Sequence, residues 1–212
     1  MPKSAGVKEP VSRDGFLFLG NHLALDFLNT RPVQNGAATE LLQDFTSVLR
    51  WFQAAQLLNE EQATDFARKW ARTPFAGSLV ENLRLLREKL RREVLRWEGS
   101  QPIHESVMEE LNRLMAEHPM RTRLKIRGRK TSAELYFEPE KPEDLLAPLA
   151  YSAAMLFVSA NRERVRKCDQ CILHFLDTSK KGTRRWCSME LCGNRLKVAA
   201  YAARQRSARV RK

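Results

Sequence analysis

The sequence predicts an α+β protein: a predominantly helical N-terminal domain that includes a small β-hairpin, followed by a small C-terminal module built on four cysteines. Three observations predict this class. Apolar residues recur every three or four positions through most of the first 160 residues, whereas one segment near residue 125 alternates instead. All 4 cysteines follow residue 160, as does most of the excess positive charge. We therefore expect a flexible leader over residues 1–13, a mixed α/β domain over 14–160 and a cysteine-containing module over 161–212.

The distribution of charge is more informative than the net charge of +12. Residues 161–212 hold 15 Lys and Arg against 4 Asp and Glu, whereas residues 1–160 hold 22 against 21. A neutral body that carries a basic module is typical of a protein that meets a polyanion. A solubilising basic tail is the alternative, but such a tail does not need the cysteines and the apolar pattern of this segment.

The composition sets the size and the compartment that we expect. A chain of 212 residues with 43% hydrophobic content is sufficient for one ordinary domain and a small module. The first segment, MPKSAGVKEPVSRDG, lacks the apolar stretch of an export signal, and no run of about 18 apolar residues occurs. We therefore expect a cytoplasmic protein without a membrane partner.

The first half of the body is expected to contain one short strand and three helices. The apolar run FLFLG at 16–20 predicts a buried strand, and HLALDFLNTRP predicts a helix that Pro32 stops. Thr39 is the expected N-cap of the second helix. Asn59 followed by Gln62 matches a capping box that opens the third helix. The apolar stripe of the second helix consists of Leu42, Phe45, Val48, Leu49 and Phe52.

The second half of the body is expected to contain three helices and a hairpin. Apolar residues at helical spacing predict a long helix around 79–97 and a shorter one around 107–115. Between 121 and 137 apolar and basic residues alternate on either side of a turn at Gly128, which predicts a hairpin. The last helix, from Leu145, is expected to run on through Val165 into the cysteine module.

The four cysteines have the spacing of a metal site. Cys168 and Cys171 form one pair, Cys187 and Cys192 form the other, and four thiolates satisfy a tetrahedral zinc ion at about 2.3 Å each. In a reducing cytosol a disulfide framework is not expected, although a disulfide, an iron–sulfur cluster and ordinary buried cysteines remain alternatives. His174 is a substitute ligand, but its apolar neighbours predict a half-buried strand position. We expect one structural zinc ion, because a closed set of four thiolates leaves no open coordination position.

The residues around the second cysteine pair predict a short turn followed by a cationic helix. Ser188 can cap a helical turn, Gly193 can end it in a left-handed conformation, and Asn194 can cap a second helix that starts at Arg195. A basic helix held by zinc suits the major groove of duplex DNA, and nearby cations suit phosphates. The predicted DNA contacts are Lys180, Lys181, Arg184, Arg185, Arg195, Lys197, Tyr201 and Arg204.

Two stretches of the chain resemble known families. FLDTSKKGTRRWCSMELCGNRLK, preceded by the first cysteine pair, resembles the CGNR zinc finger, and LALDFLNTR at 23–31 is similar to the opening of the ABATE domain that precedes this finger in bacterial proteins. The resemblance implies a stress-induced transcription regulator, with a DNA-binding finger and an α/β body that holds a ligand pocket.

The body offers few candidate functional residues of its own. His22, Asp26, Asn29 and Arg31 are the candidates for binding a small-molecule ligand, although Asp26 could instead cap or pair with a neighbouring helix, and 29–32 could simply end a helix. The patterns of a zinc protease, a zinc deaminase and a phosphate loop are all absent from the sequence. No enzymatic activity is therefore expected.

The function that we expect is transcription regulation by binding duplex DNA, in association with the nucleoid, with a body that senses a ligand or forms a homodimer. One alternative is an RNA-binding or ribosome-associated zinc protein, since zinc modules and basic helices also serve RNA. A second alternative is an enzymatic body whose finger binds another protein.

Overall fold

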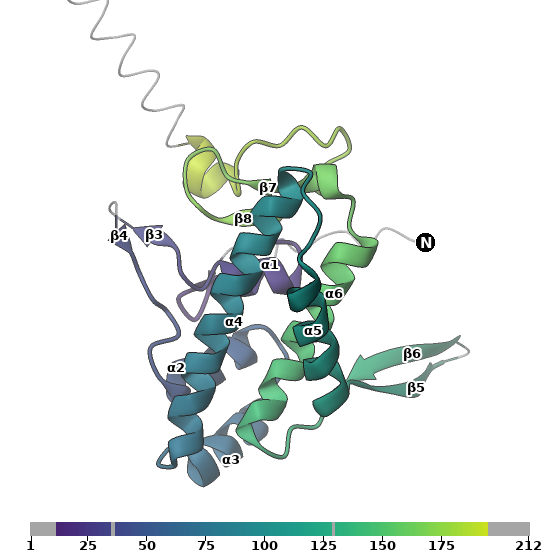
Figure 1. Ribbon diagram of the computed structural model, residues 1–212. Helices are drawn as coiled ribbons and strands as arrows, with labels where there is room; N and C mark the ends of the chain where they lie inside the picture. The colour runs from purple at the N-terminus through teal and green to yellow at the C-terminus, as the bar shows by residue number, and fades with distance from the viewer. Residues whose placement is uncertain (1–11, 35–36, 129, 195–212) are drawn as a thin grey trace, which may run out of the picture.

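Three helices that lie side by side organise the molecule, and the second of them in the chain runs antiparallel to the first and the third (Figure 1). The computed structural model describes residues 12–34, 37–128 and 130–194. In Figure 1, α4, α5 and α6 run side by side, α2 and α3 lie at one end of this layer, and the cysteine module lies at the other. The helices are α1 (Leu23–Leu28), α2 (Phe45–Ala54), α3 (Glu60–Trp70), α4 (Pro74–Glu98), α5 (Glu105–Glu117) and α6 (Ala147–Ser159).

The strands described form four separate antiparallel pairs and no larger sheet. Three of these pairs have only two or three residues in each strand, whereas β5 and β6 form a hairpin with seven residues in each strand. The mixed α+β class predicted from the sequence is confirmed. The pairs are β1 (Ser12–Arg13) with β2 (Phe16–Leu17), β3 (Val33–Gln34) with β4 (Ala37–Ala38), β5 (Arg121–Arg127) with β6 (Lys130–Tyr136), and β7 (Val165–Lys167) with β8 (His174–Leu176).

The N-terminal segment differs in detail from the prediction. Strand pairing in the run FLFLG is limited to Phe16 and Leu17, which pair with the last two residues of the expected leader, Ser12 and Arg13. The intervening turn holds Asp14 at φ 50 and Gly15 at φ 82, the left-handed region that glycine adopts without strain. The rest of the expected leader lies outside the described residues.

The helix starts show which capping predictions hold. Asn59 and Gln62 form the predicted capping box of α3, with each side chain accepting a hydrogen bond from the other residue's backbone N–H. The prediction of Thr39 as the cap of α2 is wrong, because Asp44 caps that helix and Ser47 completes a second capping box. Either residue type can cap a helix, so packing of the apolar stripe decides where α2 begins.

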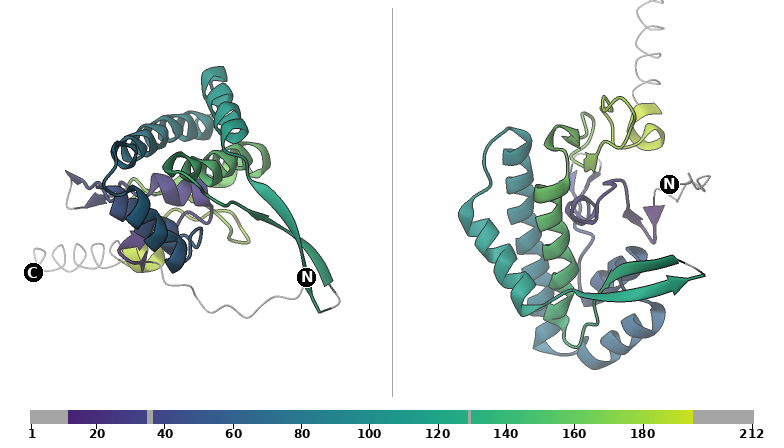
Figure 2. Two further views of the ribbon diagram at one scale, coloured as in Figure 1. Left: turned by 90° about the horizontal axis from the view of Figure 1, so that it is seen from below. Right: turned by 90° about the vertical axis from the view of Figure 1, so that its right-hand side faces the viewer.

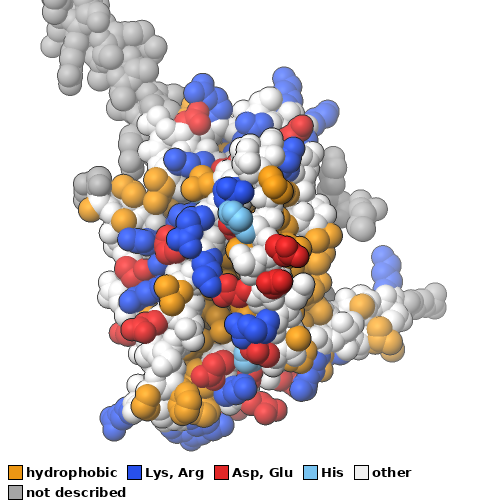
Figure 3. All heavy atoms as spheres, viewed as in Figure 1, with side chains coloured by type: hydrophobic (Ala, Val, Ile, Leu, Met, Phe, Trp, Pro, Cys, Tyr) orange, Lys and Arg blue, Asp and Glu red, His pale blue; other side chains and the backbone are white. Residues whose placement is uncertain are grey.

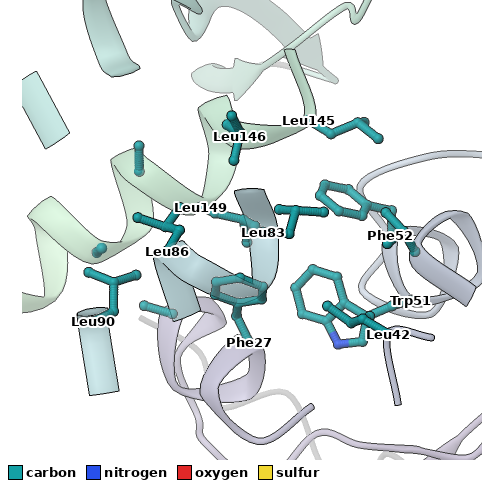
Figure 4. Close-up of a cluster of buried hydrophobic side chains, with 14 of the residues drawn as sticks. Phe27, Leu42, Trp51, Phe52, Leu83, Leu86, Leu90, Leu145, Leu146 and Leu149 are labelled. Atoms are coloured by element: carbon teal, nitrogen blue, oxygen red, sulfur yellow. The ribbon is translucent and has the colours of Figure 1, made fainter. Parts of the chain in front are cut away.

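The core lies where α1 and α2 pack against α4 and α6. Phe27 and Phe52 both contact the ring of Trp51, with ring centroids 5.8 and 5.2 Å apart, and Leu83 and Leu149 close the cluster from α4 and α6 (Figure 4). Burial of such aromatic rings contributes strongly to the stability of the body.

The last helix ends earlier than expected. α6 stops at Ser159, and the prediction that it runs on through Val165 is wrong. Asn161 accepts a hydrogen bond from Glu163 N and opens a short 3₁₀ turn, after which Val165 enters β7. Val165 still reaches the core, with 3% of its surface exposed, but it does so from a strand. In the described part of the chain, no helix is both long and apolar enough to span a bilayer.

Candidate metal centre and nucleic-acid interface

The four cysteine sulfurs converge on one point. All four Sγ atoms lie within 4.8 Å of one another, and three of the separations are 3.6, 3.6 and 3.7 Å. Sulfurs at about 2.3 Å from a central zinc in a regular tetrahedron are about 3.8 Å apart, whereas disulfide-bonded sulfurs are about 2.05 Å apart. Cys168, Cys171, Cys187 and Cys192 are therefore positioned to bind one metal ion, and a closed set of four thiolates fits one structural Zn²⁺.

The thiols need a cation in order to ionise together. Hydrogen bonds from the thiols of Cys171 and Cys187 lower the pKa of Cys168. Hydrogen bonds with Cys168 raise the pKa of Cys171 to about 12 and also raise the pKa of Cys187. Only part of the cluster therefore ionises without a metal. A bound divalent cation offsets the mutual repulsion of the negatively charged sulfurs and therefore keeps all four cysteines in the thiolate form.

The chain brings each cysteine pair together with a tight turn. Cys168 precedes a turn that closes when Cys168 N donates to Leu173 O at 2.9 Å, at the head of the β7–β8 pair. The second pair spans a single turn, Met189–Gly193, which Ser188 caps by accepting from Glu190 N. The predicted capping role of Ser188 is confirmed.

The predictions for the two residues after Cys192 are wrong. Gly193 does not adopt a left-handed conformation; a Cβ there would lie 2.6 Å from the sulfur of the half-exposed Met189 side chain, which would have to move. Asn194 has helical dihedrals, φ −68 and ψ −37, whereas an N-cap residue is extended. The helix expected from Arg195 onward lies outside the described residues.

A buried carboxylate holds the basic loop that joins the cysteine pairs. Asp177 is fully buried and accepts hydrogen bonds from Ser179 N at 2.9 Å and from Arg184 N at 2.8 Å. The Arg164 side chain crosses the loop and donates to the carbonyls of Asp177 and Ser179. Gly182 turns the loop at φ 63. The cations on this loop are therefore held on a defined framework.

The predicted DNA contacts on this loop fall into two groups. Lys180, Lys181 and Arg185 are exposed, and Arg185 pairs with Asp169 at 2.7 Å on the surface. Arg184 instead lies across the ring of Phe175 and donates to Trp186 O at 2.7 Å, so it belongs to the scaffold of the finger. The other predicted contacts, Arg195, Lys197, Tyr201 and Arg204, lie outside the described residues.

The structure adds three basic residues that the sequence reading missed. Arg162, Arg166 and Lys167 line a groove of about 500 Å³ together with Arg184 and Arg185. The groove lies between the end of α4 and the finger, and it also contains Glu98, Glu163, Val165 and Asp169. The available signal was the density of Arg and Lys between residues 162 and 167, directly before the first cysteine.

The candidate ligand residues of the body lie in and beside α1, and one of them, Asn29, contacts the finger directly. Asn29, 1% exposed, donates to His174 O and accepts from His174 N, both at 2.9 Å. His22 lies 3.3 Å from Ser152 Oγ of α6. Arg31 forms an ion pair with Glu88 at 3.3 Å.

Asp26 is buried beside the same junction. Its carboxylate accepts from Gly20 N at 2.7 Å, and Gly20 O in turn accepts from Leu176 N of β8 at 2.8 Å. Burial raises the pKa of Asp26 to about 7, against hydrogen bonds that lower it. A Cβ on Gly20 would lie 2.7 Å from Leu25 Cβ, so only glycine allows this approach.

His174 is fully buried, and the prediction of a half-buried position is wrong. Its side chain lies beside the end of α4, where Glu98 Oε2 is 3.8 Å from its Nε2. Burial lowers the pKa of His174 to about 4 and raises that of Glu98 to about 7. Neither ring nitrogen of His174 has a hydrogen-bond partner among the described residues. Its backbone, not its ring, makes the hydrogen bonds to the body.

Comparison with known proteins assigns both parts of the chain. A protein-family model, ABATE, described as "Putative stress-induced transcription regulator", matches residues 21–160. The CGNR zinc finger model matches residues 164–205. No curated protein matches the chain.

Proposed function

Because the chain belongs to the ABATE family and carries a CGNR zinc finger, we propose that it is a transcription regulator that binds duplex DNA through the finger. The observation that carries the proposal is the concentration of cations on the metal-bearing end of the molecule. Lys180, Lys181 and Arg185 are exposed there on a loop that Asp177 and the cysteine cluster hold in place. Fixed cations of this kind suit the phosphates of a duplex.

In this proposal the metal has a structural role, because it holds the cationic surface of the finger in place. Four cysteine ligands would complete the coordination of zinc, so this site would supply folding energy to the finger and no position for a substrate. Both matched families are described without an enzymatic activity, and we propose a non-enzymatic protein. In this role the protein works in the cytoplasm, on the nucleoid.

Residues beyond the described part carry the rest of the proposed interface. Residues 195–212 hold 7 Lys and Arg and no Asp or Glu. Arg195, Lys197, Tyr201 and Arg204 stay predicted contacts, and base recognition would have to come chiefly from this segment, because the loop cations suit phosphates. It also stays a prediction that the boundary between residues 160 and 161 separates a body with little affinity for DNA from a finger that binds DNA.

The test compares two pairs of cations in binding assays with labelled random-sequence duplex. Lys180→Ala combined with Lys181→Ala should weaken binding to every duplex about equally and reduce the slope of log affinity against log salt by about 1.8, two phosphates' worth. Arg68→Ala combined with Lys69→Ala removes the same charge from α3, at the opposite end of the molecule in Figure 1, and should leave the slope unchanged. Equal losses for both pairs would indicate non-specific attraction and contradict the proposal.

The alternative functions predict different outcomes. A finger that serves RNA would lose its duplex DNA to a structured RNA competitor at equal concentration, whereas a DNA regulator retains it. Selection of bound fragments from random duplex, with this competitor present, would also show the preferred sequence. No duplex binding at low salt, with zinc retained, would favour a protein-interaction role for the finger.

Ligand sensing by the body is the second half of the proposal. Asn29 and Asp26 are occupied by contacts with the finger strand and the segment beside it, so a small molecule would have to replace those contacts in order to bind them. Such replacement would couple ligand binding to the position of the finger, which is the coupling that a regulator needs.

A further inference from the structure

The cations in the described part of the finger, residues 161–194, differ from those of the body in how they are paired. Most described cations of the body form ion pairs with carboxylates; Lys89 and Arg113, for example, each do so at 2.6 Å. Of the eight Lys and Arg at 161–194, only Arg185 forms such a pair among the described residues, with Asp169. Figure 3 shows Lys and Arg side chains gathered at the upper end of the molecule, over the finger. The positive charge of this end is therefore largely uncompensated.

The loop that joins the two cysteine pairs runs beside β7 in the same direction. Near the start of the loop, Arg164 donates to Ser179 O at 2.8 Å. Near its end, Asp169 N donates to Arg185 O at 3.1 Å. An extended segment from residue 164 to residue 169 spans about 16 Å, so the two segments stay side by side over about this length.

Each of these two segments carries a row of cations, and one groove takes cations from both rows. The first row consists of Arg162, Arg166 and Lys167, and the second row of Lys180, Lys181, Arg184 and Arg185. The groove of about 500 Å³ is lined by the whole first row and by the last two cations of the second row. The 3₁₀ turn η2 (Arg162–Arg164) lies against α4, whose end forms the other side of the groove. Figures 1 and 2 show the finger on this end of the helical layer.

The first row is available to an anionic partner. The side chains of Arg162 and Lys167 are exposed and form no hydrogen bond or ion pair within the described part of the chain. Arg166 donates to Gly182 O at 3.0 Å, which leaves its charge uncompensated, and its buried Nε has no hydrogen-bond partner among the described residues. A buried donor without a partner costs free energy, which an acceptor oxygen of a bound anion would recover.

Three carboxylates line the same groove and reduce its positive charge without reversing it. Asp169 is paired with Arg185, and Glu98 lies beside His174 at 3.8 Å. Glu163 is exposed and forms no ion pair within the described part of the chain. Five cations and three carboxylates leave a formal net charge of +2 in the groove, which attracts an anion.

We propose that this groove receives the sugar–phosphate backbone of one DNA strand, with the first and second rows contacting its phosphates from two sides. The proposal rests on the proposed function, duplex binding by the finger. One strand of a duplex carries a phosphate about every 3.4 Å along the helix axis, so about 16 Å of paired segment faces about five phosphates. A polymeric anion is favoured over a small one because the cations follow two extended segments and do not surround one point.

The test is the salt dependence of the affinity of the full-length, zinc-loaded protein for labelled random-sequence duplex. Arg162→Ala combined with Lys167→Ala should reduce the slope of log affinity against log salt by about 1.8, two phosphates' worth. Arg72→Ala combined with Lys130→Ala also removes two exposed, unpaired cations, from segments that lie away from the finger in Figure 1, and should leave the slope unchanged. Glu163→Gln should raise the affinity about two- to fivefold at low salt, the effect of one exposed charge.

The outcomes separate this proposal from the proposed function. A wild-type slope in the groove variant, together with a reduced slope in Lys180→Ala with Lys181→Ala, overturns the groove and leaves duplex binding by the finger intact. A wild-type chain that does not bind duplex overturns both. Equal losses for the groove variant and its control indicate non-specific attraction and also overturn the groove.

Two further measurements keep the test decisive. If the double variant loses zinc, Arg162→Ala alone, which lies outside β7, should still reduce the slope by about 0.9. Calorimetry with inorganic phosphate in the absence of DNA tests a small anion as the occupant. Phosphate binding that the groove variant abolishes while its duplex slope stays that of wild type would assign the groove to a small phosphate-bearing ligand and overturn the proposal.

Discussion

Asp26 is a carboxylate in a buried environment, whereas aspartates usually lie at the surface. It is 8% exposed and is held by a backbone N–H, while burial raises its pKa from 3.8 to about 7. An unfolded chain releases this proton near pH 4, whereas the folded chain keeps it until about pH 7. The unfolded state therefore binds fewer protons between these values, and stability due to Asp26 falls as pH rises through this window.

Asp26→Asn should remove this pH dependence. The amide oxygen can still accept from Gly20 N, so the free energy of unfolding of the variant relative to wild type should increase from pH 4 to pH 7, by at most about 1.4 kcal/mol per pH unit, and then level off. The measurement is chemical denaturation at several pH values.

Glu61→Gln, exposed on the first turn of α3, is the matched control and should run parallel to wild type. Because Glu98 and His174 titrate in all three proteins, the differences between them isolate Asp26. Parallel profiles of unfolding free energy against pH for Asp26→Asn and wild type would show that the carboxylate has its ordinary pKa in the folded state.

Among the parts of the molecule, the finger is the one whose stability depends most on a bound metal ion. Its small core consists of Leu19, Leu173, Phe175 and three of the cysteines, and it is separate from the large core of the body. A core of this size does not hold a strand pair and a loop without a metal.

Cys187→Ser should therefore release the finger and spare the body. We expect the zinc content to fall from one per chain, hydrogen exchange to quicken across β7, β8 and the loop at 178–186, and most of the helical circular dichroism to remain. Thr183→Ala, an exposed change on the same loop, should retain zinc and protection. Unchanged zinc content and unchanged exchange in Cys187→Ser would show that Cys187 is not a ligand on which the finger depends, and a wild-type finger that is protected from exchange without zinc would show that the four sulfurs are ordinary buried cysteines.

At the scale of the whole molecule, the finger and the body share a strand edge. β8 pairs with β7 on one side, and on the other it meets Gly20, Asn21 and Asn29 of the body. Leu19, from the N-terminal segment, lies inside the small core of the finger. A change at the metal centre can therefore reach α1 directly.

Asn29→Ala should weaken this junction. It leaves the N–H and the C=O of His174 without partners in a buried place, which we expect to cost about 2 to 4 kcal/mol of unfolding free energy. Asn112→Ala, exposed on α5, should change stability by less than about 0.5 kcal/mol. Thermal denaturation of the zinc-loaded proteins checks both, and equal stability of the two variants would mean that water replaces the Asn29 contacts.

The sequence by itself determined the features that depend on local spacing. The two cysteine pairs predicted one metal site because each pair needs only a tight turn, and the amphipathic periods of α3, α4 and α5 and the alternation of β5 and β6 predicted those elements because their apolar faces recur within one element. The families were visible for the same reason, in two short contiguous motifs.

Only the tertiary structure decided the features whose partners are distant in the chain. Asn29 meets His174 across 145 positions, and this contact, together with the packing of Glu98, fully buries a histidine for which the neighbouring residues predict a half-buried strand position. Asp44 displaces Thr39 as a cap, and α6 ends at Ser159, because packing against other elements selects among locally equivalent choices. Local spacing limits what a segment can form, and long-range burial selects which of those forms is stable.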